Sequence, residues 1–131
     1  MVEQFVKYCR LYERRQFEFI DGWRQMKWNI IPDVRLTGRT PWVVENNDSY
    51  YSYILSEKEF AWKEELRFPL FQKYLVDNTI ECNIEEMNVG VYNLATNTFD
   101  FKNFSTKEVS NMIREAEDVF KNVYTEYKKR K

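Results

Sequence analysis

The stretch FSTKEVSNMIREAEDVFKNVYTEY, residues 104–127, decides the fold because it predicts one long amphipathic helix. Ser105 and Glu108 have the spacing of a capping box, in which each side chain accepts a hydrogen bond from the other residue's backbone N–H. Phe104, just before the cap, can pack against Val109. The apolar side chains recur at steps of one and three residues: Val109, Met112, Ile113, Ala116, Val119, Phe120, Val123, Tyr124 and Tyr127. Such a face must be covered, so we expect the helix to lie across a sheet.

The charge distribution separates the end of this helix from the rest of the chain. The sequence has 20 Lys and Arg and 21 Asp and Glu, a formal net charge of −1. The last four residues, Lys128 to Lys131, are all basic, which leaves 16 of the 20 basic residues for an acidic remainder. Basic residues suit the C-terminus of a helix dipole. An acidic body disfavours broad binding to a nucleic-acid backbone, so we expect no nucleic-acid partner.

Alternating patterns upstream predict strands that the helix can cover. Residues 87–94 and 98–102 form a predicted hairpin that places Phe99 and Phe101 on one face. Residues 79–85 predict a further strand, with one buried and one wet face. Its inward side chains would be Ile80, Cys82 and Ile84.

Two short helices are expected between residues 56 and 78. Ser56 and Glu59 repeat the capping-box spacing and predict a short helix. Its buried side would carry Phe60, Ala61 and Trp62. Pro69 fits the first turn of a second helix, where its missing backbone N–H leaves nothing unsatisfied. Asp77 and Asn78 would end this helix.

The region before residue 42 predicts extended chain. Alternation over residues 24–30 marks a half-buried strand, which Pro32 ends or places at a sheet edge. A second extended stretch follows. Residues 37–41, TGRTP, then indicate a turn before the next strand.

The first helix is clear at its start and ambiguous at its end. Apolar residues recur at helical spacing from residue 2 to about residue 15. Either the helix continues to a left-handed cap at Gly22, or residues 17–20 form a strand that turns at Asp21 and Gly22. The longer helix is favoured because it keeps on one face Phe19, Ile20 and Trp23.

These elements predict a single α+β domain over residues 1–131. We expect two layers, with an N-terminal helix, an antiparallel sheet of about five or six strands and one or two short helices inserted in it. The long C-terminal helix packs on that sheet.

The absence of histidine excludes several kinds of chemistry. The chain has no His and two Cys, Cys9 and Cys82, without CxxC spacing. It therefore lacks the commonest general base and the commonest nitrogen ligand for zinc, copper or iron. A Ser-His-Asp or Cys-His catalytic group cannot form within this chain. We expect no cofactor, no metal and, in the balance of evidence, no enzymatic activity.

The surroundings of the protein are inferred from its cysteines and its hydropathy. Two cysteines far apart in sequence are typical of reduced thiols in an intracellular, cytoplasmic protein. The N-terminus has charges every few residues, and no stretch is long and apolar enough for a signal peptide or a membrane span. We therefore expect a soluble protein without a membrane partner.

Aromatic side chains are the most unusual feature of the composition. The chain has ten Phe, nine Tyr and four Trp. At about 200 Å² each they would account for under a third of the surface that a chain of this size buries, so the core can hold them all. An exposed aromatic platform is therefore not required by their number.

The hairpin of residues 42–44 and 50–55, closed by a turn at 46–49, carries the candidate binding site. Because neighbouring side chains of a strand point to opposite faces, its rings cannot all lie in one core. Some must meet a second layer of helices, solvent or a partner, and Tyr and Trp are typical of binding hot spots. The candidate aromatic residues are Trp42, Tyr50, Tyr51 and Tyr53.

Other charged and polar groups give weaker signals. Arg35 and Arg39 could bind an anionic group, and the TGRT segment at 37–40 could form a backbone nest beside Arg39, although a plain turn is the simpler interpretation. Glu81, Glu85 and Glu86 lie along the predicted strand 79–85 and its exit, and two of these carboxylates could bind a cation or act as an acid–base pair, but a wet strand face is ordinarily charged.

The first functional hypothesis is a non-enzymatic protein-binding module, such as an adaptor, chaperone-like subunit or small inhibitor, with an acidic, aromatic-containing surface. The alternative is a protein that binds or sequesters a small anionic or aromatic ligand, such as a nucleotide. Its pocket would lie between the sheet and the C-terminal helix. We expect a monomer or a weak homodimer, because the same helix face is needed to cover the sheet.

Overall fold

The computed structural model describes residues 2–22, 25–32, 34–47 and 49–130. The described part of the chain holds the α-helices α1 (Val2–Arg14), α2 (Arg67–Asn78) and α3 (Thr106–Lys129). Its strands are β1 (Glu18–Asp21), β2 (Gln25–Ile31), β3 (Val34–Arg39), β4 (Trp42–Asn46), β5 (Ser49–Ser56), β6 (Met87–Asn93) and β7 (Thr98–Lys102). Two short 3₁₀ helices are η1 (Trp62–Glu64) and η2 (Ile84–Glu86). The predicted α+β class is confirmed.

Five strands form one mixed sheet in the order β1-β4-β5-β6-β7, and β2 and β3 form a separate two-stranded ribbon. The pairs β1–β4, β4–β5 and β6–β7 are antiparallel, but the central pair β5–β6 is parallel. The sheet is therefore mixed. The prediction of an antiparallel sheet is wrong for this central pair. The reason lies in the chain between β5 and β6, which crosses over through α2 and lets β6 run in the same direction as β5.

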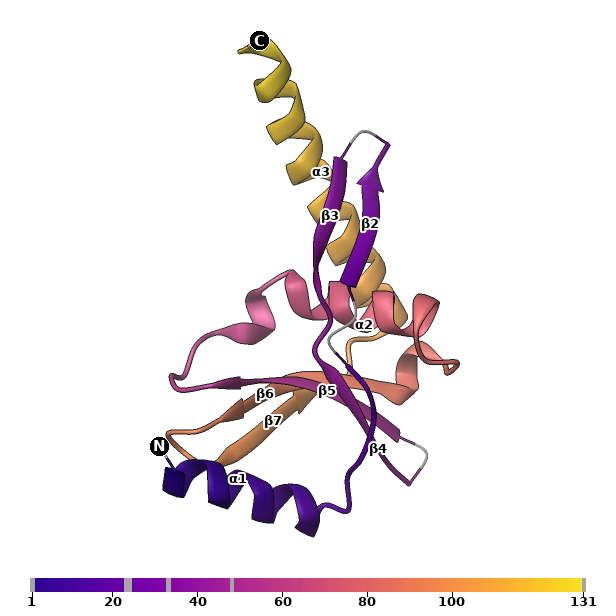
Figure 1. Cartoon of the computed structure of the whole chain (residues 1–131). Coiled ribbons are helices and arrows are strands. Elements are labelled where there is room, and N and C mark those ends of the chain that lie inside the picture. Colours follow the sequence, from indigo (N-terminus) through magenta and orange to yellow (C-terminus); the bar gives the residue numbers. More distant parts are fainter. Residues whose placement is uncertain (1, 23–24, 33, 48, 131) are drawn as a thin grey trace.

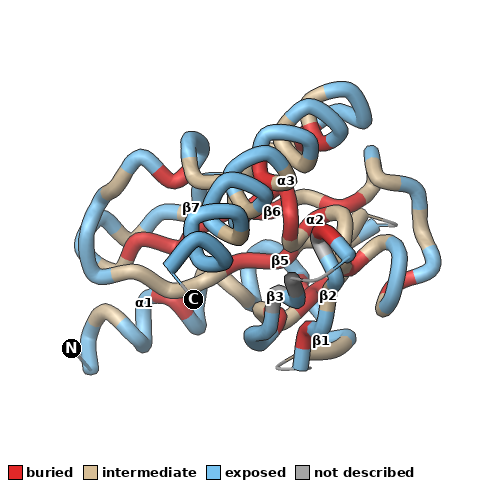
Figure 2. The backbone as a smooth tube through the Cα atoms, turned by 90° about the horizontal axis from the view of Figure 1, so that it is seen from above, coloured by how far each residue is buried: buried red, intermediate tan, exposed pale blue. Residues whose placement is uncertain are grey.

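Helices cover both faces of the sheet (Figure 1), so the expected two layers become three. α1 covers one face, where Tyr8 packs with Tyr53 and Tyr92 in a buried aromatic cluster. α2 and the start of α3 cover the other face, where Phe68 and Val109 pack with Val89 and other side chains of β6. Figure 2 shows the buried course of β6 between these layers, and six of its seven residues are buried.

The second half of α3 and the β2–β3 ribbon project together from the three layers as an arm (Figure 1). The ribbon side of α3 contributes Ala116, Phe120 and Tyr124 to a cluster with Trp28 and Ile31 of β2. The predicted alternation of β2 is confirmed over residues 25–29, because Met26 is buried and Trp28 half-buried, while Gln25, Lys27 and Asn29 are exposed. The side chain of Ile30, the next residue predicted to point inward, lies outside the described part of the structure.

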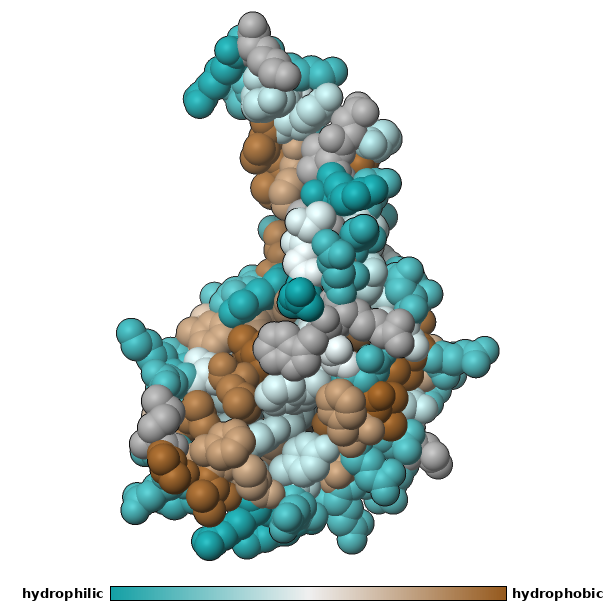
Figure 3. All heavy atoms as spheres, viewed as in Figure 1, coloured by the Kyte–Doolittle hydropathy of each residue, from teal (hydrophilic) through white to brown (hydrophobic). Residues whose placement is uncertain are grey.

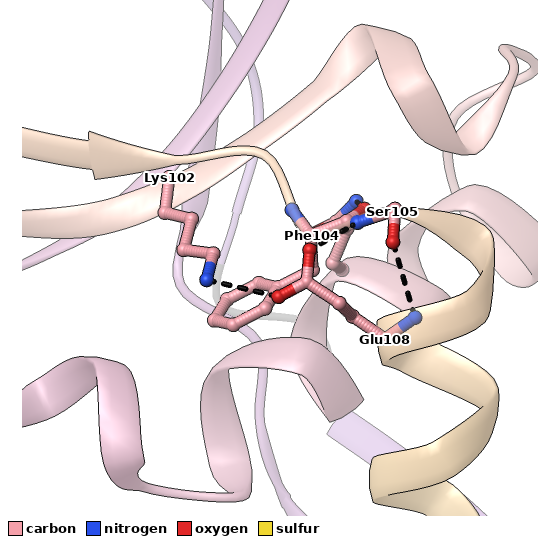
Figure 4. A network of polar contacts seen from close by, with 5 residues as sticks. Lys102, Phe104, Ser105 and Glu108 are labelled. Atoms are coloured by element: carbon pink, nitrogen blue, oxygen red, sulfur yellow. Dashed lines mark hydrogen bonds and ion pairs between the residues drawn. The ribbon is translucent and has the colours of Figure 1, made fainter.

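The start of α3 is held as the sequence predicts (Figure 4). The Ser105 side chain accepts from the backbone N–H of Glu108 at 3.1 Å, and the Glu108 carboxylate accepts from the Ser105 N–H at 3.2 Å. The carboxylate also pairs with the Lys102 ammonium at 2.9 Å. Phe104 is fully buried beside Val109.

The side chain of Gln72 in α2 bonds the loop before α3 to α2 and η2. Its side-chain amide is buried, and it both donates to the Phe104 carbonyl at 2.9 Å and accepts from the Phe104 N–H at 3.1 Å. The same amide nitrogen donates to the Ile84 carbonyl at 3.0 Å. One side chain thus satisfies the backbone of the loop before α3 and of η2.

The favoured long first helix is wrong, and the strand alternative is confirmed. α1 ends at Arg14, and Gln16 adopts a φ of 57°, in the left-handed region that turns the chain. Phe17 is then buried in the aromatic cluster. The next residues form β1 on the sheet edge, where Phe19 is 62% and Ile20 41% exposed.

The helix expected at residues 56–62 is replaced by a turn and η1. The Ser56 hydroxyl accepts from the Lys58 N–H at 3.2 Å, two residues on, so it closes a turn and caps no helix. Of the three side chains expected on the buried side of that helix, Trp62 is buried at the start of η1 and Phe60 is half-buried, but Ala61 is exposed. Pro69 does lie in the first turn of α2.

The strand expected at residues 79–85 is wrong. The N–H groups of Thr79 and Ile80 both donate to the Leu75 carbonyl at the end of α2, and Asn83 and Glu86 form a capping box around η2. These bonds use the backbone groups that a strand would pair. The turn expected at residues 37–41 is also displaced, because β3 continues through Gly38 to residue 39.

Gly90 in β6 marks a close approach of two strands. A Cβ atom there would lie 2.0 Å from the carbonyl oxygen of Asp100 on β7. We expect Gly90→Ala to lower the free energy of unfolding by about 3 kcal/mol, because a backbone atom cannot yield as a flexible side chain can. Gly38→Ala is the control, since its Cβ would come no nearer than 3.9 Å to Met26. Equal stability of the two variants in urea titrations would contradict the prediction.

The Glu108 carboxylate gives the fold a pH dependence. Its hydrogen bond with Lys102 and its bond from the Ser105 backbone lower the pKa of Glu108 from 4.5. The stability that it contributes is therefore complete above pH 4.5 and is lost as the pH falls further, through the lowered pKa. We expect Glu108→Gln to cost about 0.5 kcal/mol at pH 7, because the carboxylate is 45% exposed, and less toward pH 2. Glu126→Gln, at an exposed site in the last turns of α3, is the control in the same urea titrations.

Candidate functional site

The predicted aromatic residues of the β4–β5 hairpin do not form one exposed surface. Trp42 lies opposite Tyr53 and Val44 opposite Tyr51, so these four side chains share the face under α1. Tyr53 is 1% exposed. Tyr51 is half-buried, with its ring 5.1 Å from that of Phe17. A layer of helix therefore covers this face, which is the simpler of the two interpretations considered from sequence.

The remaining predicted residues lie elsewhere. Tyr50 points to the opposite face and packs, half-buried, beside a cluster that contains Val43 and Leu75. Arg35 is exposed on the ribbon, opposite Asn29. Neither residue lies with Tyr53.

Tyr53 forms the polar centre of the cluster under α1. Its hydroxyl and that of Tyr8 are 2.6 Å apart, which is a short hydrogen bond between two buried side chains. Burial raises the pKa of Tyr53 strongly, and it raises that of Tyr8 as well. Both hydroxyls therefore stay protonated at neutral pH and serve packing and hydrogen bonding.

Two adjoining cavities open between the arm and the three layers. The first has a volume of about 390 Å³ and is lined by Met26, Thr37, Gly38, Arg39, Leu66, Arg67, Leu70, Phe71, Ala116, Val119 and Phe120. The second has about 370 Å³ and is lined by Arg39, Thr40, Pro41, Trp42, Tyr53, Ile54, Leu55, Arg67 and Phe71. Arg39, Arg67 and Phe71 line both. We call the two cavities together the arginine groove.

The fold brings these three shared residues together from distant parts of the sequence. Arg39 ends β3, just before the buried Thr40 leads the chain into β4. Arg67 begins α2, and Phe71 follows one turn later. The groove therefore depends on α2 lying beside the point where the ribbon joins the sheet.

The Arg67 side chain is oriented by its neighbours. Its guanidinium lies 5.1 Å from the centre of the Phe68 ring and 5.6 Å from that of Phe60. Its Nε donates to the Glu65 carboxylate at 2.7 Å. A planar guanidinium held in this way can present its remaining N–H groups to a carboxylate, sulfonate or phosphate. Arg39 is exposed at the same wall.

Part of this site was predictable. The sequence analysis predicts Arg39, Trp42 and Tyr53 as binding residues, and all three line the groove. It missed Arg67 and Phe71, whose position depends on how α2 packs. The sequence carried one relevant signal, namely an arginine one helical turn before an aromatic residue on the same helix.

Other chemical groups in the described residues do not form a second centre. Glu81 is exposed, and no three Asp, Glu or Cys side chains of the described part of the chain gather as a metal site would require. Cys9 is exposed, Cys82 is half-buried, and neither forms a disulfide. Burial and the nearby Glu86 raise the pKa of the Cys82 thiol, which is the opposite of activation.

No family model, no curated protein and no solved structure matches the chain. None of the helices in the described ranges combines the length and apolarity needed to cross a membrane.

The buried tyrosine pair predicts a loss of stability in alkali. Because the pKa values of Tyr8 and Tyr53 are raised above 10 by folding, the stability that they contribute is complete below pH 10 and is lost as the pH rises above it. We expect Tyr53→Phe to cost about 1 kcal/mol at pH 8 and to reduce the further loss between pH 10 and 12. Urea titrations at each pH test this, with Tyr127→Phe as an exposed control. The same alkaline loss in both variants would contradict the prediction.

Proposed function

We propose that this protein is a non-enzymatic binding protein for a small ligand that has an apolar body and an acidic group, held in the arginine groove. The observation that carries the proposal is the position of Arg39 and Arg67 on the wall shared by two otherwise mainly apolar cavities. The proposal belongs to the second class expected from sequence, a small-ligand binding protein, but the groove is not in the expected place between the sheet and the C-terminal helix. The first cavity lies between the β2–β3 ribbon, α2 and α3, and the second lies between the end of β3, β4, β5 and α2.

The size and lining of the groove support an apolar ligand body. Each cavity lies in the range of about 300 to 1,000 Å³ typical of small-molecule sites. Leu70, Phe71 and Phe120 supply apolar walls in the first cavity, and Trp42 and Ile54 do so in the second. Removing an apolar chain or ring from water at such walls is favourable by about 25 cal/mol per Å².

The arginines support an acidic group on the ligand. Arg39 and Arg67 line both cavities, and the Glu65 carboxylate already pairs with Nε of Arg67. The other guanidinium N–H groups can bind an anion, and each charge-assisted hydrogen bond contributes about 1.5 to 3 kcal/mol. Tyr53 and Trp42 also line the second cavity, but the Tyr53 hydroxyl is bonded to Tyr8 under α1, so the arginines are the groups that would hold the acidic group. A carboxylate or sulfonate with an apolar body therefore fits both parts of the lining.

A second candidate function is that of a protein-binding module, such as an adaptor, chaperone-like subunit or small inhibitor. One observation favours it, although on a surface other than the β4–β5 hairpin. α1 and β1 expose large apolar side chains, with Val2 78%, Phe5 53% and Phe19 62% exposed. Apolar patches of this kind on a protein surface often mark protein contacts.

The proposed function is tested with a probe of matching chemistry, the aromatic sulfonate 1-anilinonaphthalene-8-sulfonate, titrated by fluorescence. We expect the double variant Arg39→Gln, Arg67→Gln to weaken its binding at least tenfold. Arg35→Gln is the matched control, because Arg35 is exposed on the same ribbon and does not line either cavity. Gly38→Leu should also weaken binding, because it fills the first cavity.

Competition experiments distinguish the contribution of the ligand's acidic group from that of its apolar body. Decanoate should displace the probe better than decanol, since only decanoate carries a charge for the arginines. Thermal melts of each variant show whether the fold is kept. Probe binding that is absent, or that falls equally in the control and the double variant, would refute the proposal.

A further inference from the structure

The charge of the arginine groove is confined to one wall. Of the described residues that line either cavity, only Arg39 and Arg67 are charged, and each of them lines both cavities. Phe71 is the third residue that the two cavities share. Because a residue can line both cavities only where they adjoin, the two arginines lie at the junction between them.

Beyond this junction, each cavity has apolar walls of its own. The first cavity is lined by Met26 of the ribbon, Leu70 of α2 and Phe120 of α3. Figure 3 shows apolar atoms along the α3 side of the arm, and α3 supplies one wall of this cavity. The second cavity is lined by Pro41, just before β4, and by Ile54 of β5. The arginines therefore lie between two apolar spaces.

The two spaces are nearly equal in size, at about 390 and 370 Å³. A cavity of about 150 Å³ is enough to bind benzene, so each space can take an apolar group larger than one ring. A ligand that fills only one of them leaves the apolar wall of the other in water. Filling both spaces therefore gives more hydrophobic stabilisation than filling either one.

The contacts of Arg67 hold its side chain at the junction without occupying the groove. Its guanidinium lies against the rings of Phe68 and Phe60, and its Nε donates to the Glu65 carboxylate at 2.7 Å. None of these three residues lines either cavity. A guanidinium has further N–H groups on its two terminal nitrogens. An acidic group that accepts from them lies next to both cavities.

We infer that the ligand carries its acidic group between two apolar arms, one for each cavity, as in a fatty acid branched at the carbon next to its carboxylate. This inference rests on the proposed function and names the class of ligand. A linear acid that places its carboxylate at the arginines has one chain and fills one cavity, unless the chain folds back on itself. A linear chain that spans both cavities carries its carboxylate away from the arginines. A two-armed acid makes both sets of contacts at once.

Two isomeric acids of equal charge test the inference. The carboxylate of 2-hexyldecanoate lies between arms of six and eight carbons, whereas hexadecanoate is linear. Both displace 1-anilinonaphthalene-8-sulfonate, followed by fluorescence below the concentration at which either acid aggregates. We expect 2-hexyldecanoate to bind about tenfold more tightly, because its second arm is also removed from water.

Filling one cavity should remove this preference. Gly38 lines the first cavity and not the second, and a Cβ atom there would come no nearer than 3.9 Å to Met26. We expect Gly38→Leu to reduce the preference for 2-hexyldecanoate from about tenfold to about twofold, while the affinity for hexadecanoate changes little. Arg35→Gln is the matched control, since Arg35 is on the same ribbon and lines neither cavity. The affinity of the fluorescent probe and a thermal melt are measured for each variant.

The outcomes distinguish this inference from the proposed function. Equal binding of the two isomers, or tighter binding of hexadecanoate, would overturn the two-armed ligand. The proposed function would survive that result if the binding were still lost in the double variant Arg39→Gln, Arg67→Gln. A preference that is kept in a folded Gly38→Leu chain would also overturn the inference. Failure of both isomers, decanoate and the probe to bind would refute the proposed function as well.

Discussion

The structure depends on one buried amide, the side chain of Gln72. It bonds both backbone groups of Phe104 and the carbonyl of Ile84, so it joins α2, η2 and the loop before α3 at a single point. A buried amide of this kind stabilises the fold only while all its bonds are made, because a lost bond leaves a polar group unsatisfied. This contact fixes the loop from which α3 starts, and burial of Val109 and Ala116 then holds the helix against the domain. The arginine groove depends on the same packing, since its walls come from α2, α3 and the ribbon.

The sequence predicted elements well where local rules and packing agree. The capping box at Ser105 and the long apolar face of α3 are both present. The predictions were wrong where one local sequence pattern is compatible with more than one structure. Ser56 closes a turn instead of capping a helix, and the alternation at Ile80 and Cys82 arises from a helix end followed by η2. The parallel pairing of β5 with β6 has no local signature, because it depends on where the crossover returns.

The candidate site was also predicted only in part, because some of its residues depend on tertiary packing. Arg39, Trp42 and Tyr53 were identified from their residue types and turned out to line one groove. Their roles differ from the expected ones, since Tyr53 is held by Tyr8 inside the domain and Trp42 is half-buried. Arg67 could not be chosen among twenty basic residues, because its place beside Arg39 is a property of tertiary packing. The exposure of Val119, Val123 and Tyr127 on α3 was likewise not predicted. A periodic apolar pattern cannot show where the layer that covers the helix ends.

The parallel pair at the centre of the sheet also has a kinetic consequence. β4 and β5 form a hairpin of neighbours in sequence, as do β6 and β7, and β1 joins β4 across the β2–β3 ribbon. Tyr53 and its parallel partner Gly90, however, are separated by the whole crossover. Closing that loop costs entropy before any bond between the halves is formed. We therefore expect the two halves of the sheet to join late in folding, with the central edge of each half unpaired until then.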